Sequence, residues 1–153
     1  MEFDIQGNLK PYDIIYTDWA TFKAEFVDAF PRSSTRQVIF ENFSVYMEKL
    51  VAIIGTDFHQ WIDGSFVTKK LDPGDIDVVT FVDASIYERN EFEIDILRDD
   101  YRDHDTRVDE YFVKRYPETH GKYDFYHMDM LQWYNQFTTS RALKSKGFIQ
   151  LNF

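Results

Sequence analysis

Apolar residues recur along the chain at two different spacings, and these spacings predict its helices and strands. From Ile39 to Ile54 the apolar residues fall every three or four positions, which is typical of the buried face of a helix. Gly55 follows directly, and glycine is a common helix terminator. Four aromatic residues between positions 19 and 30 follow the same spacing. We therefore expect two N-terminal helices within residues 17–54.

Short runs of β-branched and aromatic residues predict the strands. The strongest run is DIDVVTFV at 75–82, and weaker runs lie at 58–62 and 108–113. Helical spacing returns at about 85–100 and 124–137, and KGFIQLNF at the end of the chain predicts a last strand. This alternation favours an α+β fold with one mixed β-sheet flanked by helices.

The composition agrees with one soluble domain. The 153 residues are 44% hydrophobic and 29% charged and include no cysteine, and no Gly- or Ser-rich linker interrupts them. We expect a single domain over 1–153, with its sheet core at about 58–153. The start, MEFDIQGNLK, lacks a signal segment, and no apolar run reaches the roughly 18 residues of a membrane helix. We therefore expect a cytoplasmic protein without a membrane partner.

The charge is strongly negative and unevenly distributed. The net charge is −10, which disfavours a long nucleic acid as a partner. Residues 83–110 contain eleven acidic and four basic side chains, so this segment alone carries −7. Such a segment can bind a basic protein, and it can equally be a solvated surface.

A Gly-Ser pair precedes two aspartates in the segment WIDGSFVTKKLDPGDIDVV. Asp75 and Asp77 are two apart in a predicted strand, so both side chains point to one face and repel each other. Mg²⁺ is bound by such carboxylates together with phosphate oxygens. Gly64 permits a close backbone approach, and Ser65 offers a hydroxyl and an N–H to phosphate. With Asp109 as a third carboxylate, these parts suit two-metal phosphoryl or nucleotidyl transfer.

Basic residues near these motifs have two interpretations. Lys69 and Lys70 lie in the spacer after Gly-Ser, where mobile cations can reach the oxygens of a nucleoside triphosphate. Exposed turn lysines are the equal alternative. Arg141, Lys144 and Lys146 form the main basic cluster near the C-terminus, for which phosphate contact and a plain surface role both stay open.

This segment resembles the signature of the nucleotidyltransferase superfamily, which has the DNA polymerase β-like fold. The signature is an apolar residue with Gly-Gly or Gly-Ser, a spacer, and Asp-apolar-Asp, which read here as Ile62, the Gly-Ser pair, nine residues and Asp-Ile-Asp. From about Gly7 to the end, the chain is also similar to small bacterial and phage proteins with a nucleotidyltransferase-like domain. The stretches that carry this similarity are SSTRQVIFENF, VDEYFV, LQWYNQF and KGFIQL.

The resemblance implies a function and assigns roles to residues. Asp75 and Asp77 would bind Mg²⁺, two ions in all, with Mn²⁺ as a substitute. Asp109 would be the third carboxylate, a role for which Asp124 competes, and Gly64 with Ser65 would hold the nucleotide phosphates. The spacer FVTKKLDPG lacks the Arg-Gly that is usual in small antitoxin-type members, and 153 residues leave little room for a second, RNA-gripping domain.

Two hypotheses follow. In the first, the chain is a Mg²⁺-dependent nucleotidyltransferase that moves a nucleoside monophosphate from an NTP to a protein or small-molecule acceptor. In the second, it is a catalytically silent binding protein on the same fold, an antitoxin-like regulator that uses the acidic segment 83–110 to contact its partner.

Overall fold

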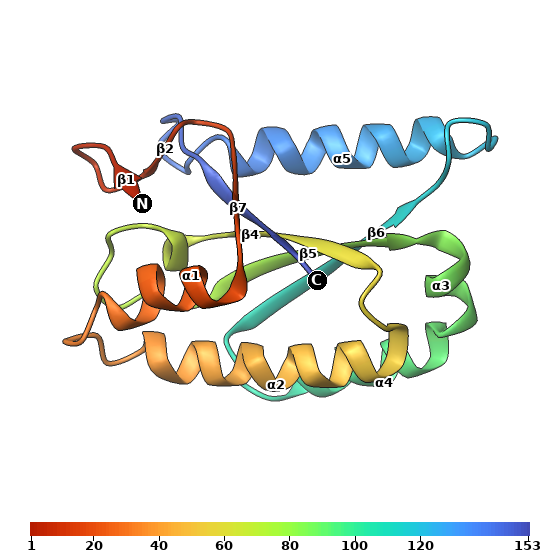
Figure 1. The fold of residues 1–153 in the computed structure, drawn as a ribbon, viewed down its shortest axis with the longest axis horizontal. Coiled ribbons are helices and arrows are strands. Elements are labelled where there is room, and N and C mark those ends of the chain that lie inside the picture. The colour runs from red at the N-terminus through yellow and green to blue at the C-terminus, as the bar shows by residue number, and fades with distance from the viewer.

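The chain forms a mixed β-sheet with helices on both faces, in a computed structural model that describes residues 1–153 (Figure 1). This arrangement confirms the expected α+β class. None of the helices combines the length and the apolarity that a membrane span requires. The elements in chain order are β1 (Glu2–Phe3), β2 (Leu9–Lys10), β3 (Ile14–Thr17), α1 (Trp19–Lys23), the π-helical η1 (Ala24–Asp28), α2 (Arg36–Ile54), β4 (Phe58–Asp63), the 3₁₀ turn η2 (Ser65–Val67), β5 (Ile76–Asp83), α3 (Ala84–Arg89), α4 (Glu91–Asp103), β6 (Val108–Arg115), α5 (Tyr123–Phe137) and β7 (Phe148–Asn152).

The main sheet has five strands in the order β3-β7-β4-β5-β6. The outer pairs β3–β7 and β5–β6 are parallel, whereas β4 is antiparallel to both β5 and β7. Strand β5 therefore lies between β4 and β6, and its residues pair with both strands. Strand β6 forms one edge of the sheet, and β1 and β2 make a separate two-stranded ribbon.

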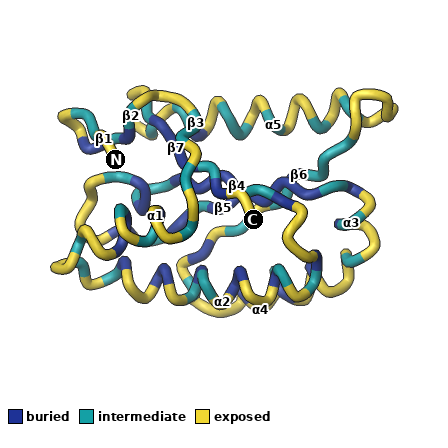
Figure 2. Tube along the Cα trace, in the orientation of Figure 1, coloured by how far each residue is buried: buried dark blue, intermediate teal, exposed yellow.

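The sheet buries both of its faces, but unequally. A large cluster of 25 buried residues fills the space between one face and the helices α1, α2 and α4. The other face carries a smaller cluster, in which Trp61, Phe81 and Phe148 pack beneath Phe137 of α5. Figure 2 shows that the buried residues follow the sheet and the side of α2 that faces it. Alternate residues of the central strands enter the two clusters in turn, as the period of two requires.

Most predicted elements are confirmed, and the differences have local causes. The predicted helix at 85–100 is two helices, because the chain changes direction at Asn90, whose amide donates to the Ile86 carbonyl at 2.8 Å. Strand β6 extends two residues further than predicted, to Arg115. Strands β1, β2 and β3 have only two to four residues each, too few for a periodic pattern to predict.

One buried arginine fastens the loop that carries the Gly-Ser pair to the start of α2. The Arg36 guanidinium donates to the carbonyls of Phe26 at 2.7 Å, Phe66 at 2.6 Å and Thr68 at 2.8 Å, and also to those of Lys70 and Leu71. Burial lowers the pKa of Arg36 to about 10, so it remains charged at neutral pH. The spacer between Ser65 and Asp75 is thus held by hydrogen bonds to one side chain.

Replacing this side chain should destabilise the chain strongly. Arg36→Met leaves the loop carbonyls without their donor, so we expect the free energy of unfolding to fall by about 3 kcal/mol, measured by urea denaturation. Arg32→Met, at an exposed position on the same segment, is the matched control and should change it by less than about 0.5 kcal/mol. Equal effects of the two substitutions would contradict this role.

Candidate functional site

The register of three strands places three aspartates in one row. Asp63 ends β4 opposite Asp77 of β5, and Asp77 in turn lies opposite Asp109 of β6. Residues that pair directly across strands project to the same face. This is the face covered by α5, and Asp75, two residues before Asp77, lies on the same side. The structure therefore brings together the three carboxylates that the sequence predicted as metal ligands.

The Gly-Ser loop lies directly against this row. A Cβ built on Gly64 would lie 2.8 Å from Oδ2 of Asp77 and 3.5 Å from the Asp77 amide nitrogen, so no other residue fits without a shift. The φ angle of Gly64, +86°, also favours glycine. Ser65 follows as the first residue of the single turn η2. The two halves of the predicted motif are thus in contact, although nine residues separate them in sequence.

Burial and mutual repulsion make the carboxylates of this row harder to ionise. The pKa of Asp77 is raised to about 6, first by burial and then by the charges of Asp75 and Asp109. The pKa of Asp109 is also raised, by burial and by Asp75, whose carboxyl lies within hydrogen-bonding reach. Like charges that lie close together favour the binding of a proton or a cation.

Asp63, the member of the row that lies on β4, is held by a lysine from the C-terminal part of the chain. Asp63 is buried and forms an ion pair with Lys146, in the loop between α5 and β7. Burial raises the pKa of Asp63 to about 7, and Lys146 opposes that rise. Oδ1 of Asp63 has no hydrogen-bond partner. Lys146 and Arg141 are also close enough to lower the pKa of Asp77, so this loop supplies the positive charge beside the row.

From the sequence, Asp63 could either orient the Gly-Ser loop or simply be a polar strand end, and the role of Lys146 was equally open. Asp63 does carry a signal, since it ends an apolar strand immediately before Gly64. No spacing connects it to Lys146, because 83 residues separate the two. Only the pairing of β7 with β4 brings the lysine to the aspartate.

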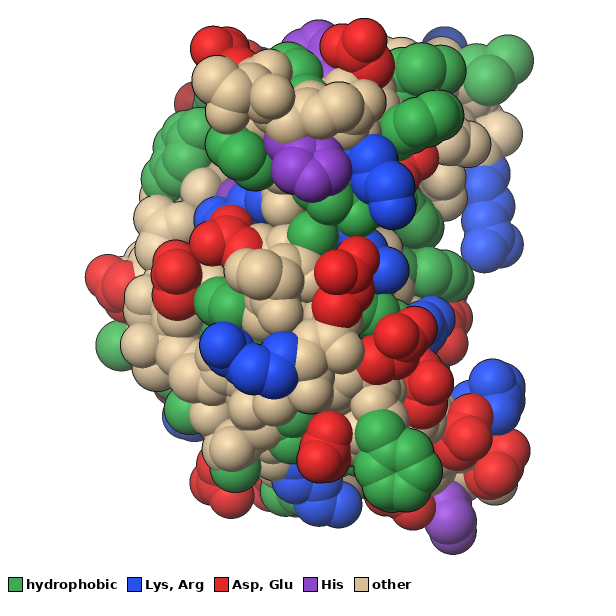
Figure 3. Space-filling model, turned by 90° about the vertical axis from the view of Figure 1, so that its right-hand side faces the viewer, with side chains coloured by type: hydrophobic (Ala, Val, Ile, Leu, Met, Phe, Trp, Pro, Cys, Tyr) green, Lys and Arg blue, Asp and Glu red, His purple; other side chains and the backbone are tan.

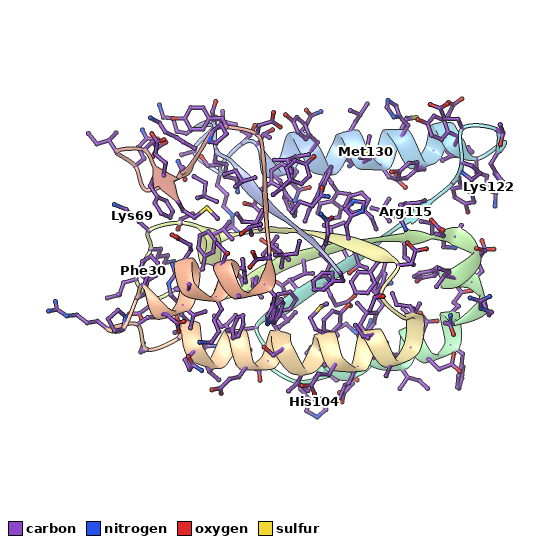
Figure 4. The ribbon with its side chains drawn as sticks, viewed as in Figure 1. Phe30, Lys69, His104, Arg115, Lys122 and Met130 are labelled. Atoms are coloured by element: carbon purple, nitrogen blue, oxygen red, sulfur yellow. The ribbon has the colours of Figure 1, made fainter.

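Three predicted residues lie apart from the row. The ammonium of Lys69 lies 5.6 Å from the centre of the Phe3 ring, and Lys70 is exposed with its carbonyl bound by Arg36. Asp124 is exposed at the start of α5, beside Lys122, and Figure 4 shows Lys122 and Lys69 at opposite ends of the molecule. Of the two candidates for the third carboxylate, Asp109 lies beside Asp77 and Asp124 does not.

The row offers the right donors for a hard cation without forming a closed site. Asp75, Asp77 and Asp109 supply only carboxylate oxygens, which suit Mg²⁺ or Mn²⁺. No group of three or more acidic, histidine or cysteine side chains converges on one point as metal ligands do. Asp77 faces Gly64 while Asp75 approaches Asp109, so side-chain rotations would be needed to enclose an ion. The donor chemistry and the raised pKa values fit a divalent cation.

A hollow of about 670 Å³ opens beside the row, along the first residues of β6. Asp75 and Asp109 form part of its wall, and Arg98, Arg102 and Arg107 form another part. Asp103, Asp105 and Glu110 also line the hollow, so its wall carries both charges, with more acidic than basic side chains.

The strain of keeping Asp77 ionised should appear in the pH dependence of stability. The pKa of Asp77 is higher in the folded chain than in the unfolded chain, so proton binding to Asp77 stabilises the fold. This contribution is complete below about pH 4 and is lost as the pH rises through about 6. Without divalent cations, Asp77→Asn should therefore match the parent below pH 4 and be more stable by about 2 kcal/mol at pH 8. Thermal or urea unfolding across this range measures the difference. The exposed Asp124→Asn is the control, and parallel curves for Asp77→Asn and the parent would contradict the account.

Comparison with known proteins gives a family but no biochemical precedent. No curated protein and no solved structure matches the chain. Residues 1–152 match one family over almost the whole length. The chain belongs to that family, which is described as a family of unknown function (DUF6932).

Proposed function

We propose that this chain is a Mg²⁺-dependent nucleotidyltransferase, which moves a nucleoside monophosphate from an NTP to a protein or small-molecule acceptor. One observation carries the proposal: Gly64 lies against Asp77 while Asp77 pairs with Asp109 in register. A loop able to approach phosphate and a set of carboxylates able to bind a cation thus meet at one end of the sheet. Neither motif alone supports this function.

In the proposed reaction, an acceptor oxygen attacks the α-phosphorus of the NTP. The bond from this phosphorus to the bridging oxygen breaks, and pyrophosphate leaves with the electron pair. Asp75, Asp77 and Asp109 would hold Mg²⁺, which when bound neutralises charge on the phosphate oxygens. Asp109 is the most exposed of the three and its pKa is raised, so its carboxylate is suited to accept the acceptor proton.

The phosphate chain would lie between the Gly-Ser loop and the C-terminal loop. Gly64 allows the phosphates to approach the backbone, and the Ser65 hydroxyl makes no hydrogen bond within the chain that would compete. Lys146 pairs with Asp63 next to Gly64, and both Lys146 and Arg141 are close enough to lower the pKa of Asp77, so they would neutralise the leaving pyrophosphate. These two residues fit the role better than Lys69, whose ammonium lies over Phe3.

The acceptor in this proposal is a protein side chain or a small molecule. The net charge of −10 repels long nucleic acids, which favours an acceptor of one of these two kinds. An acceptor hydroxyl can approach from the hollow beside Asp109.

Substitution of the aspartates should abolish metal-dependent nucleotide binding. Titration of the chain with ATP, GTP, CTP and UTP, each with and without Mg²⁺, should find at least one nucleotide that binds only with the metal. Asp75→Asn and Asp77→Asn should each weaken that binding about 100-fold, because each removes one anionic ligand. The same variants should lose transfer of labelled nucleoside monophosphate.

The control is Asp124→Asn, which removes the same charge from an exposed position and should change neither binding nor transfer. Because Asp77→Asn relieves repulsion, its loss of binding should occur in a chain at least as stable as the parent. If both site variants bound Mg²⁺ and nucleotide as well as the parent does, the proposal would be wrong. The alternative of a catalytically silent, antitoxin-like binding protein would then be favoured.

A further inference from the structure

Strand β6 has an unpaired outer edge. It is the last strand of the sheet, and all eight of its residues pair with β5 on the inner side only. An exposed strand edge presents a row of N–H and C=O groups that can pair with another strand. Proteins usually shield such edges with proline, a bulge, charged side chains or a covering segment; VDEYFVKR has no proline or bulge, and its four charged side chains are two acidic and two basic.

The pairing with β5 determines which residues face outward. The Arg107 carbonyl accepts from the Ile76 amide at 3.0 Å, and bonds in a parallel ladder involve alternate residues. Odd-numbered residues of β6 therefore bond to β5. The backbone groups of Glu110, Phe112 and Lys114 point away from the sheet and have no partner in the chain.

The sequence of β6 is complementary to itself when it is read antiparallel. With Phe112 placed opposite Phe112 of a second strand, Glu110 lies opposite Lys114 and Asp109 lies opposite Arg115. Every charged residue of the strand then faces its opposite charge, and Tyr111 faces a valine. A shift by two residues loses these matches. Cross-strand pairs of opposite charge stabilise an antiparallel pair, whereas like charges oppose it.

We propose that β6 pairs antiparallel with β6 of a second copy of this chain, about a two-fold axis at Phe112, so that the two sheets become continuous. In this register Phe112 faces Phe112 of the second copy, and Glu110 faces Lys114. The backbone N–H and C=O groups of these three residues point outward and are free to bond across the two-fold axis. About six backbone hydrogen bonds and four ion pairs then join the two copies. A two-fold arrangement is the commonest symmetry of soluble oligomers.

The side chains along this edge leave interactions for the second copy to complete. Glu110 is nearly buried, with one oxygen bound by Arg98 at 3.1 Å and Oε2 without a hydrogen-bond partner. Lys114 is about one-third exposed and lies 3.8 Å from Glu88 and 4.8 Å from the centre of the Tyr87 ring, so pairing with a second copy would exchange the contact with Glu88 for one with Glu110. The hollow beside residues 108–111 leaves room for the end of the second strand. Figure 3 shows acidic side chains gathered on one side of the molecule, where its outline is indented.

This pairing would also bring a cation to the carboxylate row. Arg115 of the second copy lies opposite Asp109, on the face that carries Asp77. Within one chain, Arg115 is at the far end of the strand beside Asp83 and lies between the sheet and α5 (Figure 4). Arg115 of the second copy would therefore compete with Mg²⁺ for the Asp109 carboxylate, so the pairing would oppose metal binding at that residue. The dimer itself rests on the strand alone and does not depend on the proposed function.

The test uses the mass of the full chain and a single introduced cysteine. Light scattering at low salt and high micromolar concentration should give twice the 18.4 kDa chain mass. The chain contains no cysteine, so Phe112→Cys introduces a unique thiol. Opposed Cα atoms at such a pair are about 5.5 Å apart, within the range of a disulfide. Mild oxidation should convert this variant to a covalent dimer, whereas Tyr111→Cys, which does not face itself, should stay uncrosslinked.

Lys114→Glu reverses one charge at the strand edge and also removes the contacts of Lys114 with Glu88 and the Tyr87 ring within one chain. It places glutamate opposite Glu110 twice, so the dissociation constant of the dimer should rise about 100-fold. Lys122→Glu is the control, with the same charge change outside the strand, and should leave the dimer intact. A monomeric parent chain would overturn the proposal. So would a dimer unaffected by Lys114→Glu, or one that crosslinks through position 111 and not 112.

Discussion

Repulsion among neighbouring carboxylates is the constraint on which the site depends. Asp75, Asp77 and Asp109 lie side by side at the starts of two parallel strands, and buried Asp63 continues the row on a third strand. Such a cluster is costly in an otherwise stable sheet, as the raised pKa of Asp77 indicates. A bound cation would relieve this repulsion, and the relief would contribute to the free energy of cation binding. The cluster therefore favours a metal-dependent function over a structural one.

The surrounding structure keeps the cluster in place and partly compensates its charge. Arg36 binds five backbone carbonyls and so fixes the loop that leads from Gly64 back to β5. Lys146, in the loop between α5 and β7, pairs with Asp63. Strand β6 carries Asp109 at one end and Arg115 at the other, so pairing between two copies would couple assembly to the charge of the site.

The local features of the site could be predicted from sequence, whereas its long-range contacts could not. The period of two in a strand was enough to place Asp75 and Asp77 on one face. Choosing Asp109 over Asp124 required the register of β5 with β6, which no local pattern encodes. The ion pair of Asp63 with Lys146 joins residues 83 positions apart, and it depends on where β7 enters the sheet. The break at Asn90 and the shortest strands were also beyond a method based on periodicity, because each involves only a few residues.

The most direct test of the central claim is to locate the metal. A crystal structure with Mn²⁺ and a non-hydrolysable nucleoside triphosphate would place the ion by its anomalous scattering. We expect Mn²⁺ bound by Asp75 and Asp77, with Asp109 beside them and the triphosphate between the ion and Gly64. Triphosphate density away from the row, with no Mn²⁺ among these carboxylates, would contradict it.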